Sequence, residues 1–178
     1  MISETVAEKD PSEAEQVVRA KVTKPMPKKE LEKHIAAFLR TQNTCVLATC
    51  KDNIPRATPM EYYSKGVTLY MMPEDGQKME NIRENPYISI GVFAPYTGWL
   101  SVKGVQITGE ATLITKEDDP KEFDKGLKVY QWQKSAEEIG LHQLPASFRL
   151  LKIEAHAIEL LDISLKTKGY APRQLWTH

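Results

Sequence analysis

The spacing of apolar residues changes along the chain from a helical period to a strand period and back. Leu31, Ile35, Phe38 and Leu39 recur at helical spacing, and Pro27 precedes them at a position where a helix tolerates a missing backbone N–H. This pattern predicts an amphipathic helix that begins near Pro27 and covers an apolar core with one face.

Strand-like segments follow this helix. Short runs rich in β-branched and aromatic residues, bounded by turn residues, predict strands at TCVLATC, RATPMEYYS, VTLYMM and YISIGVF. A longer run, WLSVKGVQITGEATLIT, predicts one or two further strands, and residues 148–161 predict a closing strand that bends near His156. Pro59 lies inside the second run and has no N–H to donate, so that strand must lie at a sheet edge or be irregular there.

Two helical segments interrupt these strands. QKMENIRE predicts a short helix that ends at Asn85, because a residue before proline avoids helical dihedral angles. A second amphipathic helix begins near Asp118 and Pro120 and should lie outside the sheet. Together these elements predict an α+β fold with an antiparallel β-barrel at its centre.

The chain ends are expected to be appendages of one domain. Residues 1–27 are polar and contain a helix-competent stretch, EAEQVVRAK, at Ser12 and Glu15, whose spacing is that of a capping box. The breaker-rich KPMPK then forms a linker. We expect the barrel domain at 28–165 and a C-terminal tail at 166–178.

Composition and charge narrow the classes of function. Apolar residues make up 41% and charged residues 27% of the chain, as in ordinary soluble globular proteins. The net charge is zero, which argues against nucleic-acid and membrane partners. The N-terminus lacks a secretory signal, so we expect a cytoplasmic protein. Cys45 and Cys50 lie on opposite faces of one predicted strand and the histidines lack ligand spacing, so we expect no disulfide between these cysteines and no metal site.

The most informative stretch is 54–93. It carries, in order, Pro55 and Arg56 on a strand, the apolar strand VTLYMM, Lys78 in a helical turn, and an Asn-Pro pair. This ordered set resembles the FMN-binding half of the pyridoxamine-phosphate-oxidase-like split-barrel family, and the likeness extends over residues 28–115. The resemblance implies a Greek-key antiparallel split β-barrel of six or so strands with flanking helices. It also implies bound flavin mononucleotide (FMN) and a homodimer with both flavins at the subunit interface.

The flavin phosphate is expected to lie beside Lys78 and Arg56. Lys78 sits in the first turn of a short helix, where free backbone N–H groups and the helix dipole favour an anion. Arg56 can add a planar, bidentate partner from the adjacent strand. Without the ordered set, both residues would be taken for ordinary solvated charges.

The flavin ring is expected to lie between two strands, and the tail is a candidate cover for the partner's flavin. A buried ring needs apolar contacts and main-chain partners for its pyrimidine edge. For Tyr70, Met71 and Met72, packing in the core is an equally fair interpretation. For the tail, a solvated chain end is an equally fair interpretation. The candidate cofactor-binding residues are Arg56, Ala57, Thr58, Pro59, Met60, Tyr70, Met71, Met72, Gln77, Lys78, Asn81, Gln106 and Trp176.

Two departures separate this chain from the orthodox oxidase of the family. Glu61 stands where that enzyme has a lysine, and the tail GYAPRQLWTH arranges its arginine, tryptophan and histidine differently. Both changes remove groups that would hold a phosphorylated vitamin, so oxidation of pyridoxamine phosphate is not expected.

The sequence therefore predicts an FMN-dependent oxidoreductase that acts on a small molecule, with reduced nicotinamide (NADH or NADPH) as a candidate donor. No catalytic side chain is assigned, because the flavin itself carries the chemistry. The alternatives are a haem-binding or haem-degrading split-barrel protein with His178 or His142 as axial ligand, and a non-catalytic flavin-binding module. A deazaflavin in place of FMN also stays open.

Overall fold

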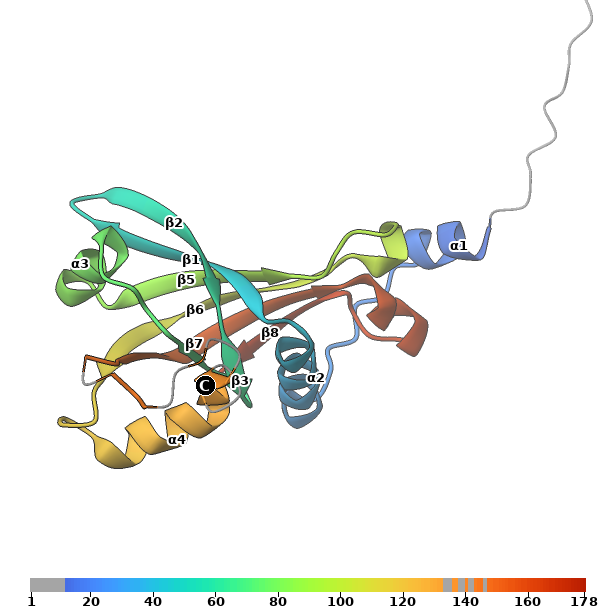
Figure 1. Cartoon of the computed structure of the whole chain (residues 1–178). Coiled ribbons are helices and arrows are strands. Elements are labelled where there is room, and N and C mark those ends of the chain that lie inside the picture. The colour runs from blue at the N-terminus through green and yellow to red at the C-terminus, as the bar shows by residue number, and fades with distance from the viewer. Residues whose placement is uncertain (1–11, 133–135, 138–139, 141–142, 146) are drawn as a thin grey trace, which may run out of the picture.

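Eight antiparallel strands form one strongly curled sheet, with helices packed around it (Figure 1). The computed structural model describes residues 12–132, 136–137, 140, 143–145 and 147–178. The helices are α1 (Glu13–Arg19), α2 (Lys28–Thr41), α3 (Gln77–Glu84) and α4 (Pro120–Tyr130), with short 3₁₀ helices η1 (Trp99–Ser101) and η2 (Ile163–Lys168). The strands are β1 (Thr44–Lys51), β2 (Ile54–Glu61), β3 (Tyr63–Lys65), β4 (Thr68–Met71), β5 (Tyr87–Phe93), β6 (Lys103–Ile114), β7 (Leu150–Asp162) and β8 (Arg173–Thr177).

The sheet closes on itself through one bent segment of chain. Its strand order is β2-β1-β5-β6-β7-β4-β3, and β8 pairs with β7 beside β4. Only Tyr62 separates β2 from β3, so the same segment pairs with β1 at one end and with β4 at the other. The result is the antiparallel split barrel with flanking helices that the sequence predicts.

The β1–β2 hairpin places β2 at the edge of the sheet. Asp52 and Asn53 take left-handed backbone angles, with φ of 52° and 60°, which suits the tight turn between two twisted strands. Within the described chain, β2 pairs only with β1, and Pro59 lies opposite Val46. The predicted edge position of the strand around Pro59 is therefore confirmed.

A bulge bends β7 at His156. Thr108 of β6 lies opposite Ala157, but Gly109 lies opposite Ala155, so His156 is the extra residue. Gly109 is required here, because a Cβ atom on it would lie 2.2 Å from the carbonyl oxygen of Glu154. The predicted bend near His156 is confirmed. The bulge divides β7 into one half that pairs with β4 and another that pairs with β8.

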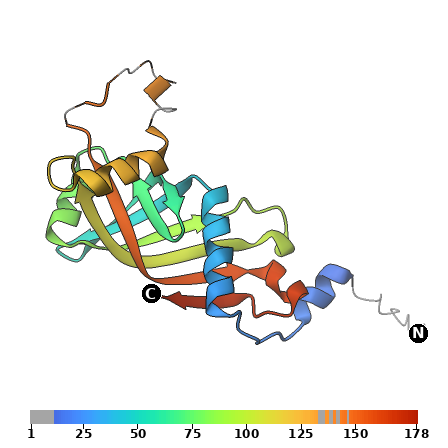
Figure 2. The ribbon, with the colours of Figure 1, turned by 90° about the horizontal axis from the view of Figure 1, so that it is seen from below.

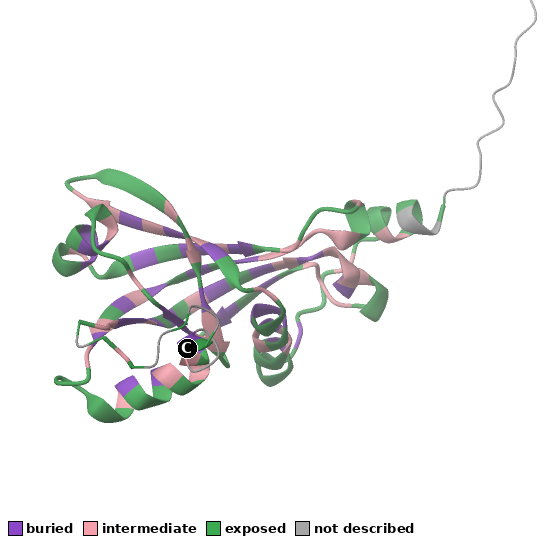
Figure 3. Cartoon of the chain, viewed as in Figure 1, coloured by how far each residue is buried: buried purple, intermediate pink, exposed green. Residues whose placement is uncertain are grey.

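Burial alternates along β1, β5, β6 and β8, so one face of each looks into the barrel (Figure 3). Helix α2 lies against β3 and β8 and buries Ile35 and Leu39 completely (Figure 2). Helix α4 packs on β3, β4 and β7 and forms a second apolar cluster through Phe123 and Tyr130. Among the described residues no helix is long and apolar enough to cross a membrane.

The C-terminal residues form a strand that the sequence analysis did not anticipate. Trp176 on β8 is only 4% exposed, and its indole N–H donates to Glu32 of α2 over 3.2 Å. Gln174 is also buried, and its side-chain oxygen accepts a hydrogen bond from the backbone N–H of Met26. The last part of the segment 166–178 is thus a strand of the sheet, packed against its own helix.

Candidate functional site

Four of the predicted residues gather on one side of β2. Arg56 pairs with Thr49 of β1, and Thr49 accepts a hydrogen bond of 3.0 Å from the side chain of Asn81 on α3. Helix α3 therefore lies on the same side of the sheet as Arg56, and Lys78 is one helical turn before Asn81. We call the group formed by Arg56, Thr58, Gln77 and Lys78 the α3 site.

The start of α3 is open toward solvent. Gly76 caps the helix without a side-chain hydrogen bond, at φ 135°, a backbone conformation that only glycine adopts readily. Its carbonyl oxygen accepts the N–H groups of Met79 and Glu80. Within the part of the chain that the structure describes, the N–H groups of Gln77 and Lys78 have no partner. Free amides and the positive end of a helix dipole make this a favourable place for an anion.

The two cations of the α3 site are uncommitted. Neither Arg56 nor Lys78 forms a hydrogen bond or ion pair with any other described residue. Their neighbour Lys51, by contrast, is paired with Glu84, and Arg83 with Asp75. The α3 site therefore concentrates positive charge that the chain itself does not neutralise.

A buried hydroxyl adds a further sign of a ligand at the α3 site. Thr58 Oγ1 is shielded from solvent and has no hydrogen-bond partner among the described residues. Such a group is unfavourable by about 1–3 kcal/mol, and native proteins rarely leave one without a functional reason. The residues present thus fit a ligand with acceptor oxygens, such as the flavin phosphate and ring that the sequence analysis predicts.

Several other predicted residues do not face the α3 site with their side chains. Tyr70 and Met71 are fully buried: the Tyr70 hydroxyl donates to Glu122 of α4, and Met71 lies in the main core. Asn81, by contrast, adjoins the α3 site: it is buried, and its amide is bonded to Thr49 and to Gln77 of that site. Trp176 is buried against α2. Met60 is partly accessible near the end of β2, and Met72, just after β4, is 40% exposed.

The remaining predicted residues lie on the opposite, outer face of the sheet. Cross-strand pairing aligns Pro59, Val46, Gly91, Gln106, Glu159 and Leu175 in one row across the strands from β2 to β8. Ala57 occupies the parallel row. Gln106 therefore faces away from the α3 site of its own chain.

A hollow of about 830 Å³ opens on this outer face, over β5, β6, β7 and β8. We call it the outer hollow. Its lining includes Phe93, Gly104, Gln106, Glu159, Arg173 and Leu175. Phe93, Glu159 and Leu175 were not among the residues predicted from the sequence. The signal for Phe93 and Leu175 is a large apolar side chain at a solvent-facing position of an amphipathic strand.

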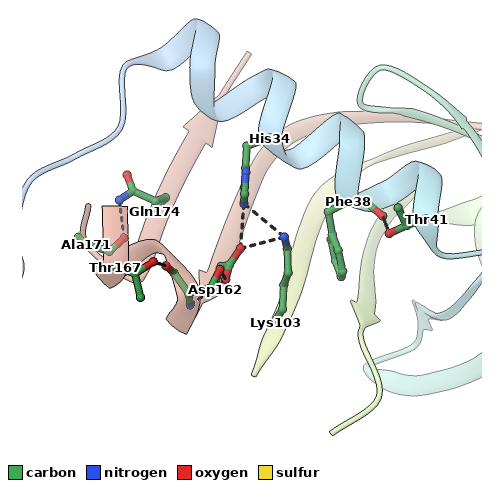
Figure 4. Close-up of polar contacts among 9 residues, drawn as sticks. His34, Phe38, Thr41, Lys103, Asp162, Thr167, Ala171 and Gln174 are labelled. Carbon is green, nitrogen blue, oxygen red and sulfur yellow. Dashed lines mark hydrogen bonds and ion pairs between the residues drawn. The ribbon is translucent and has the colours of Figure 1, made fainter. Parts of the chain in front are cut away.

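A buried carboxylate fixes the rim of the outer hollow (Figure 4). Asp162, 1% exposed, lies 2.9 Å from Lys103 Nζ and 2.8 Å from His34 Nε2, and its other oxygen accepts from the Ser164 hydroxyl and N–H. Burial alone would raise the pKa of Asp162, but hydrogen bonds from Ser164, Lys103 and His34 outweigh it and lower that pKa below its ordinary value. The Lys103 ammonium thereby pairs with Asp162 and also lies 5.1 Å from the ring centre of Phe38 on α2.

Comparison with known proteins agrees with this geometry. The family model described as pyridoxamine 5'-phosphate oxidase matches residues 31–162. The uncharacterized protein RA0666 of Rhizobium meliloti (strain 1021) is 37% identical over 65 residues, which span 35% of this chain and 41% of that relative. The matched part is therefore less than half the length of that curated relative.

Solved structures share the same fold. A presumed pyridoxamine 5'-phosphate oxidase of Listeria innocua is 25% identical, with a TM-score of 0.60 over 74% of this chain and 98% of that one. A FAD-binding protein of Mesorhizobium loti is 22% identical, with a TM-score of 0.57 over 72% and 90%. A heme-binding protein of Mycobacterium smegmatis is 18% identical, with a TM-score of 0.62 over 85% and 59%. From the family match and the curled antiparallel barrel together, this chain belongs to the pyridoxamine 5'-phosphate oxidase-like family of split-barrel proteins.

Proposed function

We propose that this protein is an FMN-binding flavoprotein that holds the cofactor phosphate at the α3 site. The observation that carries the proposal is that several unpaired groups lie together on one side of β2. Two uncommitted cations, two free backbone N–H groups and one orphaned hydroxyl lie there, counted among the described residues. A phosphate with up to two negative charges satisfies these groups together.

Three residues of the α3 site, Lys78, Arg56 and Thr58, have separate parts in binding. Lys78 supplies a compact positive charge, and Arg56 supplies a planar guanidinium group that can bind two phosphate oxygens. The hydroxyl of Thr58 donates to an acceptor on the ligand, which removes the unfavourable free energy of leaving it unpaired. Met60 and Met72 offer adaptable apolar contacts for the flavin ring. When bound, the flavin supplies hydride or electron transfer through N5, and the chain binds and orients it.

We further propose that the working form is a homodimer joined through the outer face of the sheet. Members of this family are often dimeric. Tyr87, Phe93 and Leu175 are 60%, 68% and 62% exposed on this face, which is a large apolar surface for a protein to leave in water. A second copy covers that surface and, by the family resemblance, brings the two flavins to the interface.

The proposed reaction class is oxidoreduction of a small molecule in the cytoplasm, with NADH or NADPH as the donor. Vitamin B6 oxidation is not proposed. Glu61, where the orthodox oxidase has lysine, accepts a hydrogen bond of 3.1 Å from the Tyr130 hydroxyl. This interaction holds a carboxylate at the position where a phosphorylated substrate would need a cation.

A haem-binding protein is the second candidate, because a heme-binding protein of Mycobacterium smegmatis shares this fold. It needs an axial ligand. His178 is exposed and its ring stacks on Trp176, with ring centroids 6.2 Å apart, whereas His142 lies outside the described residues. The α3 site has no role in this alternative, so FMN remains the better supported cofactor.

The proposal is tested by the absorption spectrum of the purified protein and by mass spectrometry of the small molecule released on denaturation. Flavin bands with a released mass of FMN support the proposal. A Soret band supports the haem alternative. A released molecule with the mass of a deazaflavin would show that the cofactor is a deazaflavin and not FMN. Turnover of NADH or NADPH with an electron acceptor then separates an enzyme from a flavin-binding module.

A further inference from the structure

We propose that Asp75 and Arg149 are positioning residues of the α3 site: their ion pair fixes the start of α3, and Arg149 covers the charge of Asp75 beside the bound phosphate. The proposal deepens the flavoprotein function and rests on it in one respect, because the ligand whose phosphate is held is FMN. The fixing of the helix start rests on contacts within the chain alone.

Asp75 lies in the loop between β4 and α3, directly before the glycine that caps the helix. Its oxygen Oδ2 accepts a hydrogen bond of 2.6 Å from Arg149, the last residue before β7. Its other oxygen, Oδ1, accepts a longer bond of 3.4 Å from Arg83 in the last turn of α3. One side chain therefore ties this loop both to β7 and to the helix that follows the loop.

The start of α3 has few other restraints. Gly76 caps the helix without a side-chain hydrogen bond, and glycine loses more backbone freedom on folding than any other residue. Among the described residues, the loop at 73–75 forms no hydrogen bond or ion pair other than those of Asp75. The placement of the free N–H groups of Gln77 and Lys78 therefore depends on the anchor at Asp75.

Charge gives Arg149 a second part. Asp75 is three residues before Lys78, so its carboxylate lies on the segment that leads into the α3 site. The hydrogen bond and charge of Arg149, supported by Arg83, lower the pKa of Asp75, which therefore stays ionised at neutral pH. An uncovered carboxylate here would oppose a bound phosphate, whereas two guanidinium groups offset its charge.

This ion pair is a surface contact, so its effect should be local. The side chains of Arg149 and Asp75 are 30% and 65% exposed, and pairs this exposed add little to the stability of a whole protein. Variants of either residue should therefore fold and should melt close to the wild type. A change in phosphate binding without a change in global unfolding separates a positioning residue from a general structural one.

The first measurement is hydrogen–deuterium exchange of the ligand-free protein. The N–H groups of Met79 and Glu80 donate to the Gly76 carbonyl and report on the first turn of α3. Arg149→Gln and Asp75→Ala should each speed their exchange, because the loop before the helix loses its anchor. The double variant should exchange no faster than Asp75→Ala alone, since Arg149 acts through Asp75.

The second measurement is fluorescence titration with FMN and with riboflavin, which lacks the phosphate. Arg149→Gln should weaken FMN binding by about three- to tenfold and scarcely change riboflavin binding, because the helix start loosens and a carboxylate is left uncovered. Asp75→Ala should weaken FMN binding less, since the unfavourable charge leaves together with the anchor. The double variant should match Asp75→Ala, and Arg149→Lys should recover part of the loss.

Arg40→Gln is the matched control, because Arg40 is exposed near the end of α2 and should affect neither measurement. Unchanged exchange at Met79 and Glu80 in Arg149→Gln overturns the positioning role. So does an unchanged FMN affinity, or an equal loss for FMN and riboflavin, even where Lys78→Ala shows that FMN binds at the α3 site. A wild type without FMN affinity overturns the flavoprotein function and the phosphate part of this proposal. The exchange rates then still decide whether the ion pair fixes the start of α3.

Discussion

Lys103 Nζ lies 2.9 Å from Oδ2 of the buried Asp162, and this ion pair joins the start of β6 to the end of β7 at the rim of the outer hollow. His34 of α2 approaches the same oxygen, so one carboxylate fastens a helix and two strands. The contact therefore holds α2 against the adjacent ends of β6 and β7.

Replacing Asp162 with asparagine should lower the free energy of unfolding at pH 7 by about 1–3 kcal/mol, because the variant leaves partly buried donors without their ionic partner. The pKa of Asp162 is lowered in the folded state. Its contribution is therefore fully present above the unfolded pKa of about 3.9 and is lost as pH falls through the folded pKa.

Urea denaturation of the wild type and Asp162→Asn across this pH range checks the prediction. The difference between the two proteins should be largest near neutrality and should shrink in acid. Asp124→Asn, at an exposed position of α4, is the matched control. Equal stability of wild type and Asp162→Asn at pH 7 would show that the network contributes nothing.

Trp176 and Leu175 are neighbours on β8 with opposite orientations, so their alanine variants should behave differently. Trp176→Ala should lower the free energy of unfolding by about 3–5 kcal/mol, because the indole is 4% exposed. Leu175→Ala, at a 62% exposed position, should change stability by no more than about 0.5 kcal/mol. It should instead weaken dimerisation, as measured by sedimentation equilibrium. A reversed pattern would mean that β8 does not pack as described.

Gly109 and Gly91 form a second pair with opposite expectations. Gly109→Ala should destabilise the protein by about 1–3 kcal/mol or more, because the new methyl group meets backbone 2.2 Å away at the β7 bulge. Gly91→Ala meets nothing within 4 Å in its own chain and should keep the melting temperature close to wild type. Thermal unfolding followed by circular dichroism compares the two, and equal melting temperatures would contradict the bulge.

Thr58→Val should separate folding from binding at the α3 site. Valine has nearly the same shape and removes a buried hydroxyl that has no partner among the described residues, so the ligand-free protein should be as stable as wild type or more stable. FMN affinity should fall roughly two- to tenfold through loss of one neutral hydrogen bond. Thr23→Val, at an exposed position between α1 and α2, is the control. Loss of stability without ligand would mean that Thr58 has an internal structural role.

Local signals in the sequence predicted most of the elements. Helix α3 begins and ends at the predicted residues, since Gly76 and the Asn-Pro pair act on their immediate neighbours. Pro59 identified an edge strand because the missing N–H is a property of that residue alone. The bend at His156 was also predicted, although the close approach of Gly109 to Glu154 depends on pairing between distant strands.

The sequence could not predict which side chains are buried by contacts between distant segments of the barrel. Tyr70 and Met71 are adjacent and both fully buried, because β4 has the core on one face and α4 on the other. Periodicity cannot separate such a strand from one that lines a ligand site. Trp176 was placed in a tail for a similar reason. Its burial depends on α2, which is far away in the chain, and on the pairing of β8 with β7.

The central claim is that Lys78 binds the phosphate of FMN. Lys78→Ala should leave the fold intact, because the side chain has no partner among the described residues, and should weaken FMN binding by about ten- to a hundredfold. Riboflavin lacks the phosphate, so its affinity should scarcely change. The direct measurement is fluorescence titration of wild type and Lys78→Ala with both ligands. A loss confined to FMN is the predicted result; an unchanged FMN affinity, or an equal loss for riboflavin, would contradict the claim.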